Sequence, residues 1–236
     1  MYSKLSKTYN PYIEDASPEA KAIYHARHDD FTAGIHKQIE RNPALIEFYV
    51  RLYHADEDYS QDAKSETPRD YPYKNIDMPY FSQWDARWAF DTYAGSSFGQ
   101  AGCGPTCLAM VYSSLTRKIM TPQEMGEFAI KNSYAIEDNG SSWLLMQEGA
   151  EILGLNVEVL ENTEAEYLDA LNMGKVLILI LGPGHFTSSG HFIVVHSASG
   201  KNLQIYDPFN IKNNSLNWTH EEIAVQIRYT WAYTIS

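Results

Sequence analysis

Apolar residues follow two different patterns along the chain, and the change comes near residue 175. Before that point they recur every three or four residues, as on one face of an α-helix. After it, short apolar runs are separated by turn residues, which is typical of buried strands. The pattern therefore predicts a helical part followed by a sheet. The expected fold class is α+β, and the strands should be antiparallel because short turns join them.

Helix-start signals locate the helices within this pattern. A Ser or Thr followed by Pro, or by Glu three residues later, satisfies the free N–H groups of a first helical turn. The expected helices cover residues 18–41, 44–53, 105–115, 122–131, 141–154 and 163–174, with a short one opened by 219–222. The expected strands cover residues 156–160, 176–181, 192–197, 203–207 and 228–235.

The composition changes abruptly between the second helix and the main part of the chain. Residues 56–71 are rich in Asp, Glu, Ser, Lys and Pro without an apolar period, which predicts a linker. Residues 1–70 are therefore expected to form an N-terminal helical extension with its linker, and residues 71–236 the main domain. Packing against that domain is the simplest role for the extension; a lid or a docking element are the alternatives.

The charge balance excludes several kinds of partner. The 236 residues include 18 Lys and Arg against 30 Asp and Glu, a net charge of −12. Nucleic acids and anionic membranes both select a basic patch, so neither is expected as a partner. The longest strongly apolar run, Val176–Leu181, is too short to span a bilayer.

The N-terminal residues give little indication of the compartment. Met1–Leu5 has no apolar core of the kind that a secretory signal needs. The compartment is therefore open between the cytoplasm and, if a signal segment has been removed, the surface or exterior of a bacterial cell.

The sequence Gly102-Cys103-Gly104-Pro105-Thr106-Cys107 places a thiol before a buried helix. Proline suits the first helical turn, so Pro105 marks the helix start. Cys103 then lies at the helix N-terminus, where free N–H groups and the helix dipole favour a thiolate. Cys107 falls one turn inside the helix and is expected in the core.

Metal and redox chemistry are not expected at these cysteines. The spacing of Cys103 and Cys107 has three intervening residues, where a thioredoxin-like pair has two. A zinc site would have to recruit histidines from far away. His25, His28 and His36 on the first helix are expected to be ordinary surface residues, and no cofactor is expected.

A hairpin predicts a second part of the same site. His191 begins one strand and Asp207 closes the next, with a turn at residues 199–202 between them. In such a hairpin the two side chains come within a residue or two of direct opposition. A carboxylate beside an imidazole fixes its tautomer and stabilises its protonated form, as a general base for a thiol requires. Each residue taken alone also has a non-catalytic explanation. His191 could be a histidine at the edge of a strand, and Asp207 could belong to a turn formed by Asp207-Pro208.

Two further histidines lie near this hairpin. His196, five residues after His191, should face the opposite side of the strand and belong to the core or support the site. His185 lies on the loop that leads to His191 and is a candidate for lining a cleft on the substrate side.

Several short motifs together resemble the C39-like branch of the papain-like cysteine peptidases. They run from about Met78 to the C-terminus, in this order: Gln83-Trp84-Asp85-Ala86-Arg87-Trp88, Gly102-Cys103-Gly104-Pro105-Thr106, Thr121-Pro122, Gly190-His191-Phe192-Ile193-Val194-Val195 and Asp207-Pro208. The resemblance implies a papain-like fold, in which a helical lobe carries the cysteine and an antiparallel sheet carries histidine and aspartate. It also implies that Cys103 is the nucleophile, His191 the base and Asp207 the orienting acid.

The same resemblance implies a glutamine that stabilises the oxyanion together with the backbone N–H of the nucleophile. In many relatives it lies six positions before the cysteine, but here Ser97 occupies that position. Gln83 fits the longer spacing of stand-alone C39-like proteins and is assigned this role. Gln100 is the alternative.

These observations predict a cysteine peptidase that cleaves peptide or amide bonds through a Cys-His-Asp triad and a thioester. Its expected partner is a peptide or protein substrate. A cell-wall amidase or an acyl transferase could use the same residues, and a non-catalytic peptide-binding module could retain the fold. The N-terminal helices could also block the cleft of a latent enzyme. The resemblance also includes domains of peptide exporters that remove leader peptides. That activity is not expected here, because this sequence has no membrane spans and no P-loop.

Overall fold

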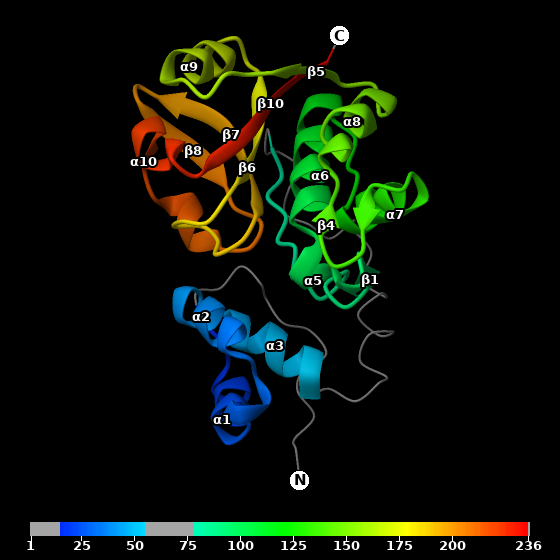
Figure 1. Cartoon of the computed structure of the whole chain (residues 1–236), viewed down its shortest axis with the longest axis vertical. Helices are drawn as coiled ribbons and strands as arrows, with labels where there is room; N and C mark the ends of the chain where they lie inside the picture. The colour runs from blue at the N-terminus through cyan, green and yellow to red at the C-terminus, as the bar shows by residue number, and fades with distance from the viewer. Residues whose placement is uncertain (1–14, 55–77, 236) are drawn as a thin grey trace.

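The structure, a computed structural model, describes residues 15–54 and 78–235. The predicted linker at residues 56–71 and the segment Met1–Leu5 lie outside the described residues. A sheet with two helices on its outer side forms one lobe, and a set of helices around α6 forms the other (Figure 1). The three N-terminal helices lie together at the lower end of this view, beneath both lobes.

The N-terminal extension consists of short helices. They are α1 (Pro18–Ala26), the 3-10 helix η1 (His28–Asp30), α2 (Ala33–Arg41) and α3 (Leu45–His54). The prediction of one helix over residues 18–41 was therefore wrong. Thr32 has an extended backbone, and its hydroxyl accepts a hydrogen bond from the N–H of Ile35, so a new helix starts there.

Helix α3 packs directly on the main domain. Phe48 is fully buried in one apolar cluster with Trp84 and Ala89. A Cβ atom at Gly99 would lie 2.5 Å from the Phe48 ring, so the backbone at Gly99 has room only for glycine. This cluster therefore joins the N-terminal helices to the main domain.

The helical lobe is built around α6. Its elements are the hairpin β1 (Thr92–Tyr93) and β2 (Ser96–Ser97), α5 (Phe98–Ala101), α6 (Cys103–Thr116), α7 (Pro122–Lys131), the hairpin β3 (Ala135–Ile136) and β4 (Gly140–Ser141), η4 (Trp143–Leu145) and α8 (Glu148–Ile152). The capping box predicted at Thr121 and Glu124 opens α7 as expected. The single helix predicted over residues 141–154 was wrong: Gln147, with ψ of −78°, separates η4 from α8.

The second lobe is an antiparallel sheet in the order β5-β10-β6-β7-β8-β9. Its strands are β5 (Asn156–Val159), β6 (Val176–Leu181), β7 (His191–Ser199), β8 (Asn202–Tyr206), β9 (Trp218–Thr219) and β10 (Ile227–Thr234). All neighbouring pairs are antiparallel, so the predicted α+β class is confirmed. The C-terminal strand β10 inserts between β5 and β6, which the sequence pattern does not indicate.

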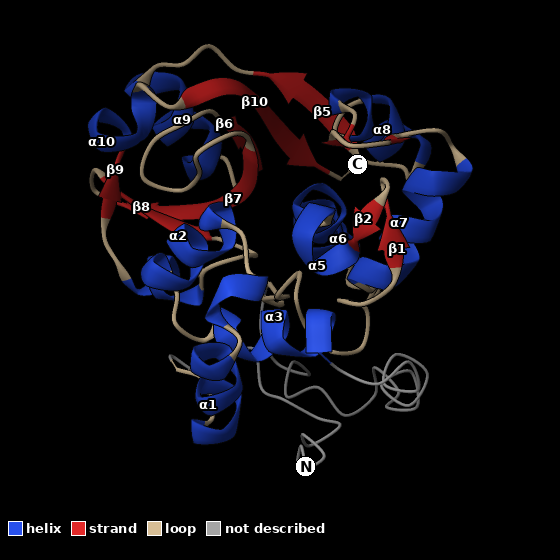
Figure 2. Cartoon of the chain, turned by 60° about the horizontal axis from the view of Figure 1, so that its bottom comes forward, coloured by secondary structure: helices blue, strands red, loops and turns tan. Residues whose placement is uncertain are grey.

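The sheet is buried on both faces. One face packs on α6 through a cluster that contains Ile178, Phe192 and Val194. The opposite face packs on α9 (Glu164–Asn172) and α10 (His220–Ala224) through a cluster that contains Leu177, Ile193 and Tyr167. Figure 2 shows α6 beside the sheet on the side opposite α9 and α10. This sandwich holds the start of α6 against the first residues of β7.

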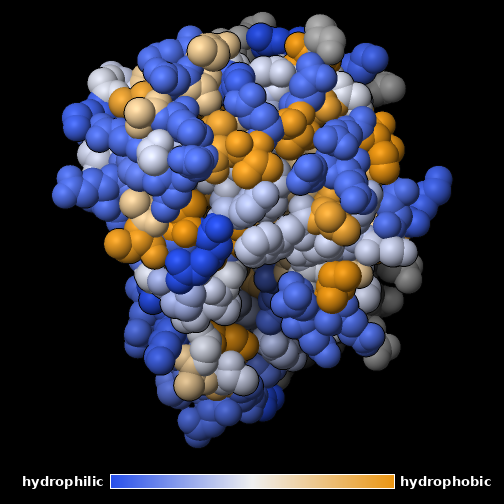
Figure 3. All heavy atoms as spheres, turned by 45° about the horizontal axis from the view of Figure 1, so that its top comes forward, coloured by the Kyte–Doolittle hydropathy of each residue, from blue (hydrophilic) through white to orange (hydrophobic). Residues whose placement is uncertain are grey.

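Figure 3 shows small hydrophobic groups separated by hydrophilic side chains on the face in view. The most exposed large apolar residues, Met173 and Val225, lie at the ends of short helices. Within residues 15–54 and 78–235, no helix has the length and hydropathy required to cross a bilayer.

Candidate active site

Helix α6 begins at Cys103, two residues earlier than Pro105 predicts. Pro105 takes the third helical position, where an N–H group would have no partner within the helix anyway. Cys103 therefore lies in the first turn, where the helix dipole favours negative charge. The thiol is partly buried and free, whereas Cys107 is fully buried in the core as predicted.

Glycine after the cysteine lets the helix start approach a neighbouring hairpin. A Cβ atom at Gly104 would lie 2.5 Å from Oγ of Ser141 in β4. The Ser141 hydroxyl is fixed in turn by a 2.7 Å hydrogen bond with the hydroxyl of Tyr93. The close contact between α6 and this hairpin fixes the position of Cys103 from one side.

His191 and Asp207 meet as the predicted hairpin requires. Nε2 of His191 lies 2.7 Å from Oδ1 of Asp207, and both side chains are buried. The strand register pairs Val194 with Tyr206, so Asp207 lies two residues from direct opposition to His191. Because Asp207 occupies Nε2, Nδ1 is the imidazole nitrogen left for Cys103.

Four donors hold the Asp207 carboxylate. Oδ1 accepts hydrogen bonds from His191 and from the backbone N–H groups of Phe209 and Asn210, at 2.9 and 3.2 Å. Oδ2 accepts a 2.7 Å hydrogen bond from Nδ2 of Asn213, in the 3-10 helix η5 (Ile211–Ser215). The carboxylate therefore has one orientation, and it fixes the plane of the imidazole.

The electrostatics favour an ion pair between Cys103 and His191. Burial opposes charge on both groups, but it is outweighed. The Asp207 carboxylate and the hydrogen bonds to Asp207 and Cys103 raise the pKa of His191 to about 10. The hydrogen bond from His191, its positive charge and the backbone of Gly104 lower the pKa of Cys103. Burial raises the pKa of Cys107, so only one of the two thiols is activated.

Gln83 and Gln100 both lie near Cys103 but differ in their surroundings. Gln83 is buried, and its Nε2 donates one hydrogen bond of 2.9 Å to the carbonyl of Gly99. Among the described residues, its second Nε2 hydrogen has no acceptor, and its backbone N–H donates to the carbonyl of Pro208, next to Asp207. Oε1 of Gln100 accepts from Ser96 and Ser97 at the surface of the helical lobe. Gln83 is therefore buried with one donor left over, whereas the Gln100 carbonyl is held by two hydroxyl groups.

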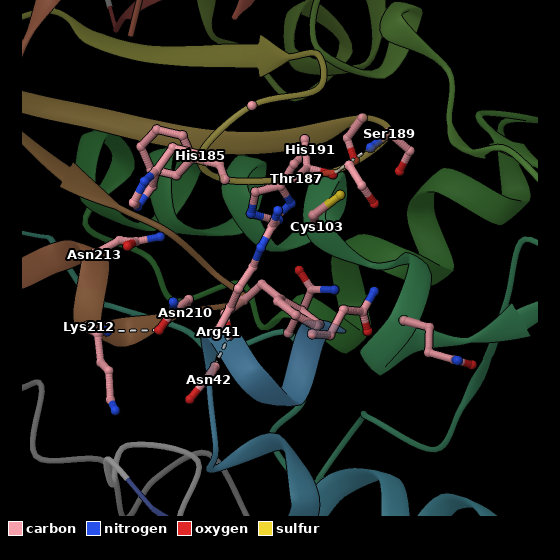
Figure 4. Close-up of a pocket in the computed structure, with 18 of the residues that line it drawn as sticks. Arg41, Asn42, Cys103, His185, Thr187, Ser189, His191, Asn210, Lys212 and Asn213 are labelled. Carbon is pink, nitrogen blue, oxygen red and sulfur yellow. Dashed lines mark hydrogen bonds between the residues drawn. The ribbon is translucent and has the colours of Figure 1, made fainter. Parts of the chain in front are cut away.

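Cys103 lies at the boundary of two cavities. The first, of about 530 Å³, is lined by Gln83, His191, the loop that contains His185, the segment after Asp207 and part of α2 (Figure 4). The second, of about 930 Å³, is lined by Trp143, Phe192, Gly140 and other residues between the two lobes. His191 lines the first cavity but is absent from the wall of the second. We call them the imidazole-side pocket and the groove.

Four other histidines make ring contacts outside the Cys103–His191 pair. His185 lines the imidazole-side pocket and makes an edge-to-face contact with Trp218 at a centroid distance of 4.7 Å. The His196 ring packs at a tilted angle against Tyr206, and burial lowers its pKa. His28 and His36 stack on each other at the surface of the N-terminal helices. Among the described residues no group of three His, Cys, Asp or Glu side chains could hold a metal ion.

Sequence reasoning did not identify the residues that support Asp207. Asn213 binds its carboxylate, Asn214 accepts a 2.7 Å hydrogen bond from its backbone N–H, and Tyr80 donates to its carbonyl. The cluster of asparagines at residues 210–214 was the available signal, because Asn side chains often complete turns. The part of α2 that reaches the pocket gave no such signal, since it lies far away in the sequence.

Solved structures that are similar to this chain share little of its sequence. The peptidase domain of Streptococcus ComA, a bi-functional ABC transporter involved in a quorum sensing pathway, is 17% identical, with a TM-score of 0.46; the match covers 58% of this chain and 93% of that one. A putative C39-like peptidase from Bacillus anthracis is 13% identical, also with a TM-score of 0.46, and the match covers 67% of this chain and 95% of that one. Comparison with curated protein sequences gave no match.

The sequence itself gives a clearer assignment. The profile of the Peptidase_C39 like family matches residues 75–235, which is more than half of the chain and includes Cys103, His191 and Asp207. The α+β architecture described above agrees with a C39-like peptidase fold. The resemblance found in the sequence motifs is thereby confirmed: the chain belongs to the Peptidase_C39 like family.

Proposed function

We propose that this protein is a cysteine peptidase that hydrolyses a peptide bond through Cys103, His191 and Asp207. Membership of the C39-like family supports a peptidase-type function. The roles of the three residues rest on their arrangement. A thiol lies at a helix start, and Nε2 of the neighbouring imidazole is held 2.7 Å from a carboxylate. The same imidazole lowers the pKa of Cys103.

The reaction follows from the ion pair. The Cys103 thiolate attacks the carbonyl carbon of the scissile amide, and the carbonyl oxygen becomes an oxyanion. The second Nε2 hydrogen of Gln83 and the backbone N–H of Cys103 are the donors proposed for that oxyanion. The C–N bond then breaks, and the imidazolium of His191 gives its proton to the leaving nitrogen. A thioester and a free amine result.

Water completes the cycle. Neutral His191 accepts a proton from a water molecule, whose oxygen attacks the thioester carbon. The C–S bond breaks, and the acid product leaves while Cys103 and His191 return to the thiolate–imidazolium pair. Asp207 does not exchange protons in this scheme; it holds the imidazole and stabilises its charge.

A hydrolysis assay with matched cysteine variants tests this function. A library of short peptides with quenched fluorophores is incubated with the wild type, with Cys103→Ala and with Cys107→Ala. We expect cleavage that is lost in Cys103→Ala and retained in Cys107→Ala, because Cys107 is buried and unactivated. Full activity of Cys103→Ala on a peptide that the wild type cleaves would contradict the proposal. Cleavage of murein fragments but of no peptide would favour the amidase alternative.

A further inference from the structure

On the proposed function, the amine part of the substrate leaves first, and its place follows from the position of His191. His191 has to give its proton to the leaving nitrogen, so the leaving group must lie on the side where the imidazole is accessible. The imidazole lines the imidazole-side pocket and not the groove. The acyl part of the substrate therefore lies in the groove, and the leaving group enters the imidazole-side pocket.

The N-terminal extension supplies part of this pocket. Gln38, Arg41 and Asn42, at the end of α2 and just after it, line the pocket together with Cys103 and His191. Nδ2 of Asn42 donates a 3.3 Å hydrogen bond to the carbonyl of Phe209, which also accepts a hydrogen bond from the indole of Trp84. These contacts join the end of α2 to the segment that follows Asp207, so this wall of the pocket has a fixed position.

The charge in this pocket is opposite to that of the protein. The chain has a net charge of −12, yet no Asp or Glu is among the described residues that line the pocket. The lining includes Arg41, Lys212 and His185. Figure 4 shows the Arg41 side chain rising from α2 into the pocket with its guanidinium directed toward His191, whereas the Lys212 side chain extends away from Cys103. Arg41 is therefore the cation that a ligand beside Cys103 would meet.

Within the described part of the chain, the Arg41 side chain makes no hydrogen bond or ion pair, although a guanidinium carries five donors in a planar fork. Such a fork matches the two oxygens of a carboxylate. A volume of about 530 Å³ lies in the range of pockets that enclose small ligands, about 300–1,000 Å³. The pocket beside Cys103 thus has a wall supplied by α2 and carries an anion-binding group.

We propose that Arg41 is a specificity-determining residue that binds a carboxylate of the leaving group. The carboxylate is either the free C-terminus of a short leaving segment or an acidic side chain close to the scissile bond. The N-terminal extension is then part of the substrate site, and the enzyme selects substrates by the charge on the side that leaves.

Affinity-directed alkylation tests this assignment without a known substrate. Three reagents carry the same bromoacetyl group: N-bromoacetyl-glycine, its amide N-bromoacetyl-glycinamide, and N-bromoacetyl-aspartic acid α-amide, whose only carboxylate is on the side chain. The rate of labelling of Cys103 is measured by peptide mapping in the wild type, Arg41→Gln and Lys212→Gln. For each protein, the labelling rate with each of the two acids is divided by the labelling rate with the glycinamide. Comparing these ratios between the proteins cancels changes in the intrinsic reactivity of the thiol.

We expect Arg41→Gln to lower this ratio about 10-fold or more, the usual effect of losing a hydrogen bond to a charged group, and Lys212→Gln to keep the wild-type ratio. Preference for N-bromoacetyl-glycine identifies a C-terminal carboxylate as the ligand, and preference for the aspartic acid reagent identifies an acidic side chain. An equal ratio in the wild type and Arg41→Gln, with rapid labelling by the glycinamide, would overturn the assignment of Arg41 and leave the proposed function intact. Absence of labelling by every reagent would contradict the proposed function as well.

Discussion

Asp207 holds His191 across the β7–β8 hairpin at 2.7 Å, although the two residues lie two positions out of direct register. The offset is possible because Asp207 has left the strand. Its carboxylate is turned toward His191 by the backbone N–H groups of Phe209 and Asn210 and by the side chain of Asn213. The relationship depends on the loop after β8 as much as on the sheet.

Replacement of Asp207 by Asn tests this relationship. The variant loses the negative charge that raises the pKa of His191, so that pKa should fall. We expect a loss of hydrolysis of about 10²- to 10⁴-fold, the usual contribution of general acid–base catalysis, and a shift of the alkaline limb of the pH profile to lower pH. Asn213→Ala is the matched control, because it removes one hydrogen bond and keeps the charge. A wild-type pH profile in Asp207→Asn would show that Asp207 does not act through His191.

Gln83 and Gln100 can be separated by comparing two reactions of Cys103. Hydrolysis passes through an oxyanion, whereas alkylation by iodoacetamide does not require an oxyanion site. We expect Gln83→Ala to lower kcat by about 10²- to 10³-fold while the alkylation rate changes little. Gln100→Ala should leave both rates near the wild-type values. A loss of kcat in Gln100→Ala, with kcat of Gln83→Ala near the wild-type value, would identify Gln100 as the oxyanion donor.

The Cys103–His191 pair should also make stability depend on pH. The pKa of His191 rises from 6.5 to about 10 on folding, so its contribution is complete below pH 6.5 and is lost as the pH rises through about 10. The pKa of Cys103 falls below 9.0 on folding, so its contribution is present above pH 9.0 and is lost as the pH falls through the lowered value. Between about pH 9 and 10 the unfolded chain has lost both protons while folded His191 keeps its own, so stability should fall there as the pH rises.

Urea unfolding of the wild type and of the double variant Cys103→Ala/His191→Gln measures this contribution. We expect the difference between their free energies of unfolding to fall as the pH rises above about 9. A difference that is independent of pH from about 5 to about 10.5 would show that the two groups do not form an ion pair in the folded protein.

The N-terminal helices should stabilise the protein and not inhibit it. Phe48 is fully buried between α3 and the main domain, so Phe48→Ala should lower the free energy of unfolding by about 3–5 kcal/mol in chemical denaturation. Replacement of the exposed Tyr53 by Ala on the same helix is the control and should cost much less. A rise in hydrolytic activity after removal of residues 1–70, with stability maintained, would instead support a latent enzyme.

Local signals in the sequence predicted most of the elements that carry the site. The Pro105 position indicated the start of α6 to within two residues, and the turn before Asn202 placed His191 near Asp207. Capping residues likewise located the starts of α7 and α10. These features depend on a few neighbouring residues, which is why a single sequence shows them.

The features that were missed depend on long-range contacts. The insertion of β10 between β5 and β6 and the packing of Phe48 beside Gly99 leave no periodic pattern in the sequence. The same holds for Arg41, whose helix reaches the pocket through contacts with Phe209 and Trp84. The break before α2 was missed because Thr32 lies in a polar stretch that reads equally well as continuous helix.

The central claim is that Cys103 is a thiolate paired with His191, and alkylation by limiting iodoacetamide tests it most directly. The rates of Cys103 and Cys107 are scored separately by peptide mapping from mildly acidic to alkaline pH, in the wild type and in His191→Gln. The account predicts rapid labelling of Cys103 that persists below neutral pH, moves to alkaline pH in His191→Gln, and leaves the buried Cys107 unlabelled. Slow labelling of Cys103 that rises only toward alkaline pH, and equally in both proteins, would contradict the account.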